Sequence, residues 1–188
     1  MLCVDEKSQI QALDRTQPLL PLRPGMPARQ TYAYQRNGTT TLFAALSMLD
    51  GQVIGDGMPR HRHQEFIRFL KRIDADTPIH LDLHLIVDHY GTPKHPRVKS
   101  WLKRHPRFYL HCTPTSRAWL NRAERWFREI TQKRWRRGSF KNVATLVATI
   151  TEYIENHNQH PQVFVWSASV ERMMTKISKC KEALGTPH

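Results

Sequence analysis

The spacing of apolar and polar residues predicts strands in the first third of the chain. Runs rich in Thr, Tyr, Leu and Phe are typical of strands. These runs predict strands over residues 31–36, 39–49 and 52–54, and residues 2–5 are predicted to be the end of a further strand that stops at Asp5. Four prolines between residues 18 and 27 exclude a helix and a central strand, so an extended connector is expected there. The pair Asp50-Gly51 predicts a two-residue hairpin turn, which makes the opening strands an antiparallel three-strand meander.

Helical spacing dominates the rest of the chain. Apolar residues at this spacing predict a helix capped by Ser116 and amphipathic helices over residues 63–74, 96–105, 142–157 and 169–183. Two short apolar runs, residues 84–87 and 108–112, predict further strands. A meander followed by strand–helix–strand–helix indicates the α/β class, with a mixed sheet and helices on its faces. The RNase H-like architecture has this order of elements, and other α/β layouts remain open.

The chain is strongly basic, with 29 Lys and Arg against 16 Asp and Glu and a net charge of +13. Such an excess favours a polyanionic partner, because neutralised phosphates release their condensed counterions. We expect nucleic acid rather than a membrane surface or a ribosome-like scaffold, although charge alone does not distinguish an enzyme from a passive binder. No apolar run approaches the roughly 20 residues of a membrane span. The three cysteines lie far apart and fit reduced thiols in a cytosolic protein.

Three carboxylates, Asp5, Asp88 and Glu124, are the candidates for chemistry. Asp88 follows a predicted strand, where open α/β sheets place their ligand sites. Glu124 lies four residues after Leu120 and three before Phe127, so it is expected at the edge of the core-facing side of its helix. Taken singly, each acid also has an ordinary interpretation as a cap, turn or solvent-exposed residue. If they converge, charges ~4 Å apart repel by ~4 kcal/mol at an effective dielectric near 20, and protonation or a hard cation must relieve that repulsion.

Magnesium is the cation expected at such a site. Mg²⁺ takes oxygen ligands and suits phosphate substrates, and two ions about 4 Å apart would activate the attacking oxygen and stabilise the leaving one. Zinc is an alternative, because a strand that extended back to His80 would place His80, Asp82 and His84 on the same face as Asp88. Their spacing matches no standard zinc pattern. Neither a GxSxG motif nor a phosphate-binding glycine loop is present in the sequence.

The segment around Glu124 is unusually basic. Nine Lys and Arg lie between residues 117 and 141, and Trp119, Trp126 and Trp135 are interleaved with them. Eight of these cations are expected to contact DNA phosphates: Arg117, Arg122, Arg125, Arg128, Lys133, Arg134, Arg136 and Arg137. The alternative is a solvated helix face above core tryptophans. Trp119 and Trp126 are expected in the core.

Several motifs together resemble a known family. The chain resembles bacterial insertion-sequence transposases of the mariner-like superfamily in VDEKSQIQALDRTQPLLPLRPG, GTTTLFAAL, PRHRHQEF, HLIVDHYGTPKHPRVKSWL and HCTPTSRAWLNRAERWF. The likeness runs from about Val4 to Trp166. Matched motif by motif, the family's Asp-Asp-Glu triad falls on Asp5, Asp88 and Glu124, and the 35 residues between the last two fit the family's spacing.

The resemblance implies an RNase H-like DDE catalytic domain over residues 1–141, with residues 142–188 as a C-terminal helical extension of the same domain. It implies an endonuclease that depends on Mg²⁺, or on Mn²⁺ in its place, cleaves DNA at transposon ends and joins the freed 3′-hydroxyl to target DNA. It also implies insertion at a TA dinucleotide and action as a homo-oligomer. The expected location is cytoplasmic and nucleoid-associated, without a membrane partner.

The chain departs from the family pattern in three respects. His89 stands where Asn is usual and Pro93 where His is common, and neither position is an expected metal ligand. The family's N-terminal helix-turn-helix region does not precede Asp5. We therefore hypothesise an N-terminally truncated copy, or the second reading frame of a split gene. Two other functions remain open: an inactive remnant that only binds DNA, and an RNase H-like nuclease that cuts without joining strands.

Overall fold

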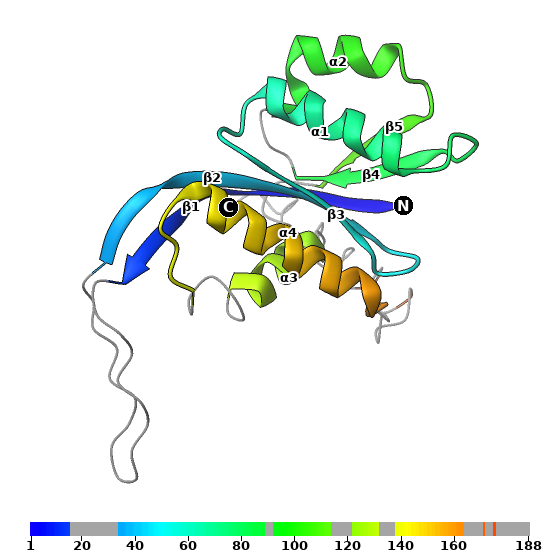
Figure 1. The fold of residues 1–188 in the computed structure, drawn as a ribbon. Coiled ribbons are helices and arrows are strands. Elements are labelled where there is room, and N and C mark those ends of the chain that lie inside the picture. The colour runs from blue at the N-terminus through cyan, green and yellow to red at the C-terminus, as the bar shows by residue number, and fades with distance from the viewer. Residues whose placement is uncertain are drawn as a thin grey trace, which may run out of the picture.

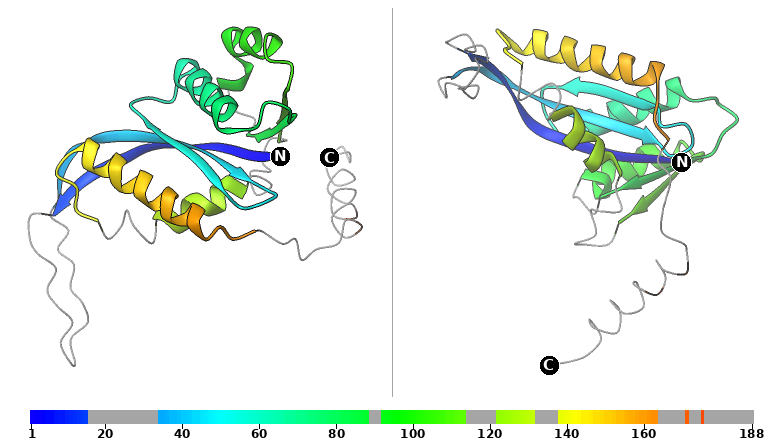
Figure 2. Two further views of the ribbon diagram at one scale, coloured as in Figure 1. Left: turned by 45° about the vertical axis from the view of Figure 1, so that its right-hand side comes forward. Right: turned by 90° about the horizontal axis from the view of Figure 1, so that it is seen from below.

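The protein is built on a five-stranded sheet with helices on both faces (Figure 1, Figure 2). The computed structural model describes residues 1–15, 34–88, 92–113, 122–131 and 138–163, together with Glu171 and Thr175. Its elements are β1 (Leu2–Arg15), β2 (Tyr34–Ser47), β3 (Val53–Met58), α1 (His63–Asp76), β4 (Leu83–Val87), the 3₁₀ helix η1 (Thr92–Lys94), α2 (Pro96–Lys103), β5 (Phe108–Cys112), α3 (Arg122–Ile130) and α4 (Val143–Gln159). None of the described helices is long and apolar enough to span a membrane.

β1 is the central strand of the sheet. The order across the sheet is β3-β2-β1-β4-β5. β1 pairs antiparallel with β2 and parallel with β4, while β2 pairs antiparallel with β3 and β4 pairs parallel with β5. The predicted antiparallel meander is therefore confirmed as β1–β2–β3, and two parallel strands extend the sheet on the other side of β1. The predicted α/β class is also confirmed.

The first two strands are longer than the sequence pattern predicts. β1 runs past Asp5 to Arg15, and the two strands predicted after the prolines merge into β2. Pairing with β2 shifts register after Lys7, and Gln9 there has a φ of 55°. This irregularity interrupts the alternation of side chains on which a strand prediction depends. The connector predicted over residues 18–27 lies outside the described residues.

The turn between β2 and β3 also differs from the prediction. The N–H of Ser47 donates to the carbonyl of Gln52 at 2.8 Å, so the loop holds the four residues 48–51. Gly51 has a φ of 74°, a left-handed conformation that glycine adopts without strain, and its N–H donates to the carbonyl of Ser47 at 3.1 Å. The predicted hairpin is confirmed, and its two-residue turn is wrong.

The remaining described elements follow the predictions closely. α1, α2, α4, β4 and β5 begin and end within two residues of their predicted bounds. The helix predicted after Ser116 is present as α3, although Ser116 itself lies outside the described residues. Of the helix predicted over residues 169–183, only Glu171 and Thr175 are described, and both are helical.

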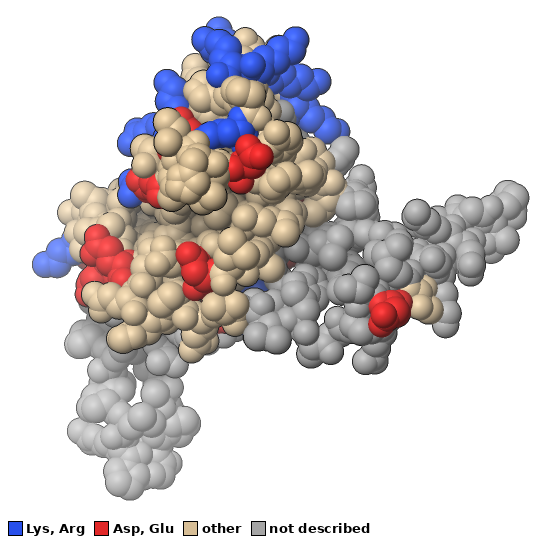
Figure 3. All heavy atoms as spheres, turned by 90° about the vertical axis from the view of Figure 1, so that its right-hand side faces the viewer, with Lys and Arg blue, Asp and Glu red and all other residues tan. Residues whose placement is uncertain are grey.

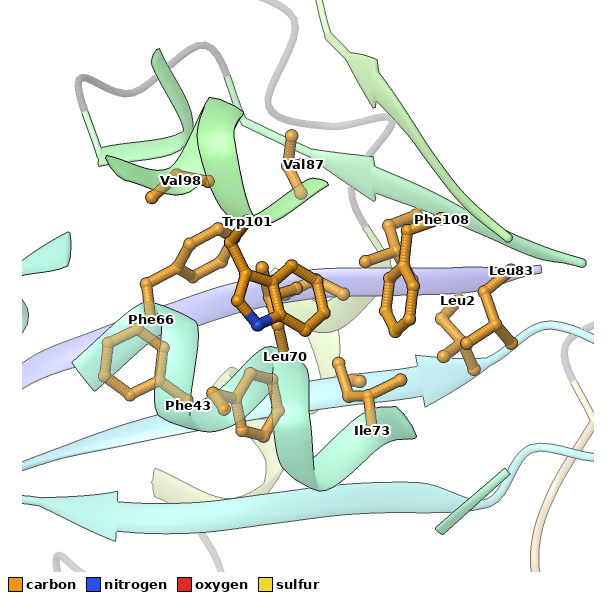
Figure 4. Packing of buried hydrophobic residues seen from close by; sticks show 14 of the residues in the cluster. Leu2, Phe43, Phe66, Leu70, Ile73, Leu83, Val87, Val98, Trp101 and Phe108 are labelled. Atoms are coloured by element: carbon orange, nitrogen blue, oxygen red, sulfur yellow. The ribbon is translucent and has the colours of Figure 1, made fainter. Parts of the chain in front are cut away.

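Alternate residues of the central strand enter two separate hydrophobic cores. Leu2 and Val4 point toward α1 and α2, whereas Cys3 points toward α3 and α4. The core under α1 and α2 is rich in aromatic rings (Figure 4). Phe43 and Phe69 have ring centroids 5.6 Å apart. Complete burial of one such side chain stabilises a protein by about 1.5–3 kcal/mol, so this layer is held mainly by apolar contact.

α4 covers the opposite face and is fastened to the outer strand. A Cβ on Gly55 of β3 would lie 2.5 Å from Ile154 Cδ1, so glycine lets the helix approach the sheet closely. The amide of Asn158 donates to the carbonyl of Val53 at 2.9 Å and accepts from the N–H of Val53 at 2.8 Å. This side chain pairs with the edge of β3 as a neighbouring strand would, and it satisfies backbone groups that an edge strand leaves exposed.

Arg107, just before β5, holds the C-terminal end of α1. Its guanidinium donates to the carboxylate of Asp74 at 2.8 Å, to the carbonyl of Pro78 at 2.7 Å and to the hydroxyl of Thr77 at 2.9 Å. It also donates to the carbonyl of Asp74 at 2.9 Å, and the Arg107 side chain is only 15% exposed. One cation thus satisfies acceptors that the end of a helix leaves unpaired.

Arg107→Ala should lower the free energy of unfolding by about 2–4 kcal/mol, because it removes the donor that these acceptors share. For a domain of this size that is a fall in melting temperature of roughly 4–16 °C. Arg72→Ala is the control, since Arg72 forms an exposed ion pair with Asp76 at 3.3 Å, and such pairs contribute only ~0.3–0.5 kcal/mol. Equal melting temperatures of the two variants, followed by circular dichroism, would contradict the role of Arg107.

Candidate active site

Parallel pairing of β1 and β4 brings Asp5 and Asp88 together. The register pairs Val4 with Val87, and Asp5 and Asp88 are the next residue on each strand. Parallel strands alternate in phase, so both carboxylates leave the sheet on the face to which Cys3 points, which α3 and α4 cover. Both side chains are half-buried.

Thr113, directly after β5, orients Asp88. Its hydroxyl donates to Asp88 Oδ1 at 3.1 Å, and its backbone N–H donates to the carbonyl of Val87 at 2.9 Å. Thr113 is itself buried. The end of β5 therefore fixes the carboxylate at the carboxyl end of β4, where open α/β sheets place their ligand sites.

α3 supplies the third acid. Ala123, Phe127 and Ile130 are buried against the sheet and centre the apolar side of this helix. Glu124 directly follows Ala123, so it lies about 100° around the helix axis from Ala123. The Glu124 side chain is exposed. The expected position of Glu124 at the edge of the core-facing side, away from solvent, is therefore wrong.

The charges of both other acids affect the pKa of Asp5. Its pKa is raised from the usual 3.8 to about 7, chiefly by burial. The negative charges of Asp88 and Glu124 also raise it, while the N–H of Glu6, which donates to Asp5 Oδ1 at 2.8 Å, and the charge of Lys7 lower it. The fold thus brings Asp88 and Glu124 within electrostatic reach of Asp5, although the three acids come from separate parts of the sequence.

Glu6 is an acid that the sequence analysis missed. It pairs with Phe43 of β2 and lies on the sheet face opposite to Asp5, on the side of α1 and α2. Burial, followed by the charges of Asp5 and Asp88, raises the pKa of Glu6 from 4.5 to about 7. Its place beside Asp5 is visible in the sequence, but a strand predicted to stop at Asp5 gives no reason to expect that Glu6 is buried.

The described residues contain no ready-made metal cluster, since no three of their His, Cys, Asp or Glu side chains stand together in a way that would hold an ion. The zinc alternative needed a strand that reaches back to His80, and it is wrong because β4 begins at Leu83 and leaves His80 and Asp82 outside the strand. His84 Nδ1 shares a hydrogen bond of 2.9 Å with His111 Nε2. The donor types of the acid group do fit a hard cation, because all three are carboxylates. Ligation by all three requires the exposed Glu124 side chain to turn toward Asp5 and Asp88.

The structure describes only part of the predicted cationic set. Arg125 and Arg128 are exposed on α3, and Arg125 lies 3.8 Å from Glu129. The backbone of Arg122 is helical. The other predicted contacts lie outside the described residues: Arg117, Lys133, Arg134, Arg136 and Arg137. Trp126 is buried, as predicted, and Trp119 and Trp135 are outside the described residues.

In the absence of divalent cations, the protein should lose stability as the pH rises from about 4 to about 7. Over this interval folded Asp5 and Glu6, with pKa values of about 7, retain protons that the unfolded chain has released. Asp5→Asn should make the drop in melting temperature between these two pH values smaller by roughly 2–4 °C, which is the shift that ~1 kcal/mol produces in a domain of this size. The measurement is thermal denaturation in EDTA across this pH range. Exposed Asp82→Asn is the control, and an Asp5→Asn profile parallel to wild type would contradict the raised pKa.

Known proteins of similar sequence or structure support the predicted fold. A family model described as DDE superfamily endonuclease matches residues 1–147. The structure is similar to a pre-cleavage Mos1 transpososome, with a TM-score of 0.63 and 13% identity over 100% of this chain and 56% of that chain. A Mos1 strand transfer complex gives a TM-score of 0.61 at 13% identity, over 97% of this chain and 51% of that one. A Mos1 transposase paired-end complex with the left transposon end gives 0.60 at 14% identity, over 96% and 52%.

The chain spans about half the length of these Mos1 chains. At such low identity the likeness shows the fold alone, and it confirms the RNase H-like architecture. No curated protein sequence matches the chain. Because the family model covers most of its length and the fold agrees, the chain belongs to the DDE superfamily endonuclease family.

Proposed function

We propose that this chain is the catalytic domain of a DNA transposase, which cleaves DNA strands at transposon ends and joins the freed 3′-hydroxyl to target DNA. The observation that carries the proposal is the register of β1 and β4, which puts Asp5 next to Asp88 on the face of the sheet that α3 covers, where the charges of Asp88 and Glu124 both raise the pKa of Asp5. Membership of the endonuclease family supports phosphodiester chemistry at these acids. Likeness of fold to Mos1 complexes, one of them a strand transfer complex, supports transposition as the context.

Mg²⁺, with Mn²⁺ as a substitute, is the cofactor that we propose for the acid group, with Asp5, Asp88 and Glu124 as its ligands. Two such ions would activate the attacking oxygen and stabilise the leaving oxygen of the phosphodiester. The protein's own part is to hold Asp5 and Asp88 half-buried next to each other and to orient Asp88 through Thr113. Because protons compete with the cation for Asp5, whose pKa is about 7, cation affinity should rise with pH through neutrality.

The proposed partner is DNA, bound through its phosphates. Arg125 and Arg128 are exposed on the helix that carries Glu124, so cations and acid reach solvent from one element. The rest of the proposed contact set is Arg117, Arg122, Lys133, Arg134, Arg136 and Arg137. Such contacts position a nucleic acid without reading its sequence. We further propose that the active form is a homo-oligomer that acts at the nucleoid.

Asp88→Asn should reduce nicking of supercoiled plasmid DNA in Mg²⁺ or Mn²⁺ by at least about 100-fold, because loss of a metal-binding carboxylate removes several kcal/mol of transition-state stabilisation. Asp82→Asn is the matched control, since it makes the same chemical change at an exposed residue just before β4. Equal nicking by the two variants would exclude Asp88 from catalysis. Wild-type protein that binds DNA but does not nick it with either cation would be a non-catalytic DNA binder.

Strand joining distinguishes a transposase from a nuclease. A labelled duplex with a free 3′-hydroxyl should become joined to a plasmid target, and Glu124→Gln should abolish joining and nicking together because one acid group serves both steps. Glu129→Gln is the control on the same helix, where Glu129 pairs with Arg125 at 3.8 Å, and it should retain both activities. Nicking without joined products on a gel would identify an RNase H-like nuclease instead.

A further inference from the structure

The outer surface of α2 is a second concentration of positive charge, separate from the basic segment around α3. The sequence contains no Asp or Glu between Asp88 and Glu124. In the space-filling view, Lys and Arg gather at the top of the molecule, where α2 lies (Figure 3). α2 packs with α1 on one face of the sheet, whereas Asp5 and Asp88 emerge on the opposite face.

The helix separates its apolar and cationic positions completely. Val98 and Trp101 are buried in the core that α2 shares with α1 and the sheet. The four cations of α2 and its C-cap are all exposed: Arg97, Lys99, Lys103 and Arg104. They flank Ser100, which is also exposed, and extend over ~10 Å of the helix axis. The solvent side of α2 therefore presents a rigid cationic ridge.

This ridge is electrostatically unfavourable for the helix itself. Lys99 and Lys103 are four residues apart, a spacing at which like charges repel across one helical turn. Arg97 lies in the first turn, where the positive end of the helix dipole disfavours a cation. The ion pairs within the described residues are Arg68–Asp56, Arg72–Asp76, Arg107–Asp74 and Arg125–Glu129. None of them neutralises the ridge, so its field reaches solvent.

A second segment of the chain adds to the same surface. His95, the N-cap of α2, stacks on His63 of α1 with ring centroids 3.8 Å apart. Desolvation and the neighbouring His95 and Arg97 lower the pKa of His63, while the charge of Glu65 raises it, so His63, His95 and Arg97 lie close together. Arg60 and Arg62 precede His63 along the chain and are exposed. The sequence PRHRH thus joins the N-terminal end of the ridge.

We propose that the cationic ridge of α2, extended by Arg60 and Arg62, binds a segment of nucleic-acid backbone outside the active site. Phosphates at regular intervals match a row of exposed Lys and Arg on a rigid helix, and contact of this kind is independent of base sequence. An anionic membrane is the weaker candidate, because helices that bind membrane surfaces insert an apolar side. The apolar side of α2 is already buried in the core. The inference does not depend on catalysis.

The test compares two double variants of the full chain with equal loss of charge. Arg97→Gln with Lys103→Gln removes two cations of the ridge, and Arg36→Gln with Lys71→Gln removes two exposed cations from β2 and α1. Binding of a labelled random-sequence DNA duplex is measured by fluorescence anisotropy between low and moderate NaCl. Neither variant should lower the melting temperature, because all four side chains are exposed.

The ridge variant should bind DNA roughly tenfold or more weakly at moderate salt, and the slope of log Kd against log[NaCl] should fall by ~1.8, the loss of two phosphate contacts. The control should stay near wild type. Equal weakening in both variants would overturn the proposal, since net charge alone would then explain it. Ridge-dependent binding to phosphatidylcholine–phosphatidylglycerol vesicles but not to DNA would overturn it in favour of a membrane. Loss of nicking in Asp88→Asn with ridge-dependent DNA binding intact would separate this surface from the proposed catalysis.

Discussion

β1 and β4 run parallel, and this pairing places Asp5 beside Asp88 although 82 residues separate them in the sequence. Every other part of the site is arranged around that pair. β5 pairs with β4 and ends at Thr113, which orients Asp88. α3 packs on the same face of the sheet through its apolar side, and this contact brings Glu124 within electrostatic reach of Asp5. A shift of one residue between β1 and β4 would send the two carboxylates to opposite faces.

Gathering acids in this way is unfavourable for the protein on its own. Burial and mutual repulsion raise the pKa values of Asp5 and Glu6 to about 7, so the folded chain holds protons near neutral pH. A structure optimised only for stability would not place ionisable groups there, and such groups are common at functional sites for that reason. A hard cation would relieve the repulsion that the proton now relieves. Glu124 is exposed, so it does not share the burial of Asp5 and Asp88.

The sheet separates two kinds of surface. On one side, α3 carries Glu124 together with the exposed Arg125 and Arg128. On the other side, α2 carries cations without any acid, and its apolar residues are committed to the core. The shared strand ends connect the two sides, because α2 begins eight residues after Asp88. The positive charge of the described residues is therefore divided between two faces of the sheet, and only one of these faces also carries the three acids.

The sequence by itself determined the α/β class and most element bounds after residue 60, because these depend on local periodicity. Its motifs also singled out three acids, whose catalytic role stays a prediction. It did not predict the length of β1, since the polar run after Asp5 and the register shift at Gln9 conceal a strand whose pairing partners lie elsewhere. Nor did it predict the half-buried Glu6, the exposed Glu124 or the contact of Thr113 with Asp88. Those features depend on which side chains the sheet and helices place around each residue. Burial and charge proximity are properties of packing between distant segments, and only the tertiary structure decides them.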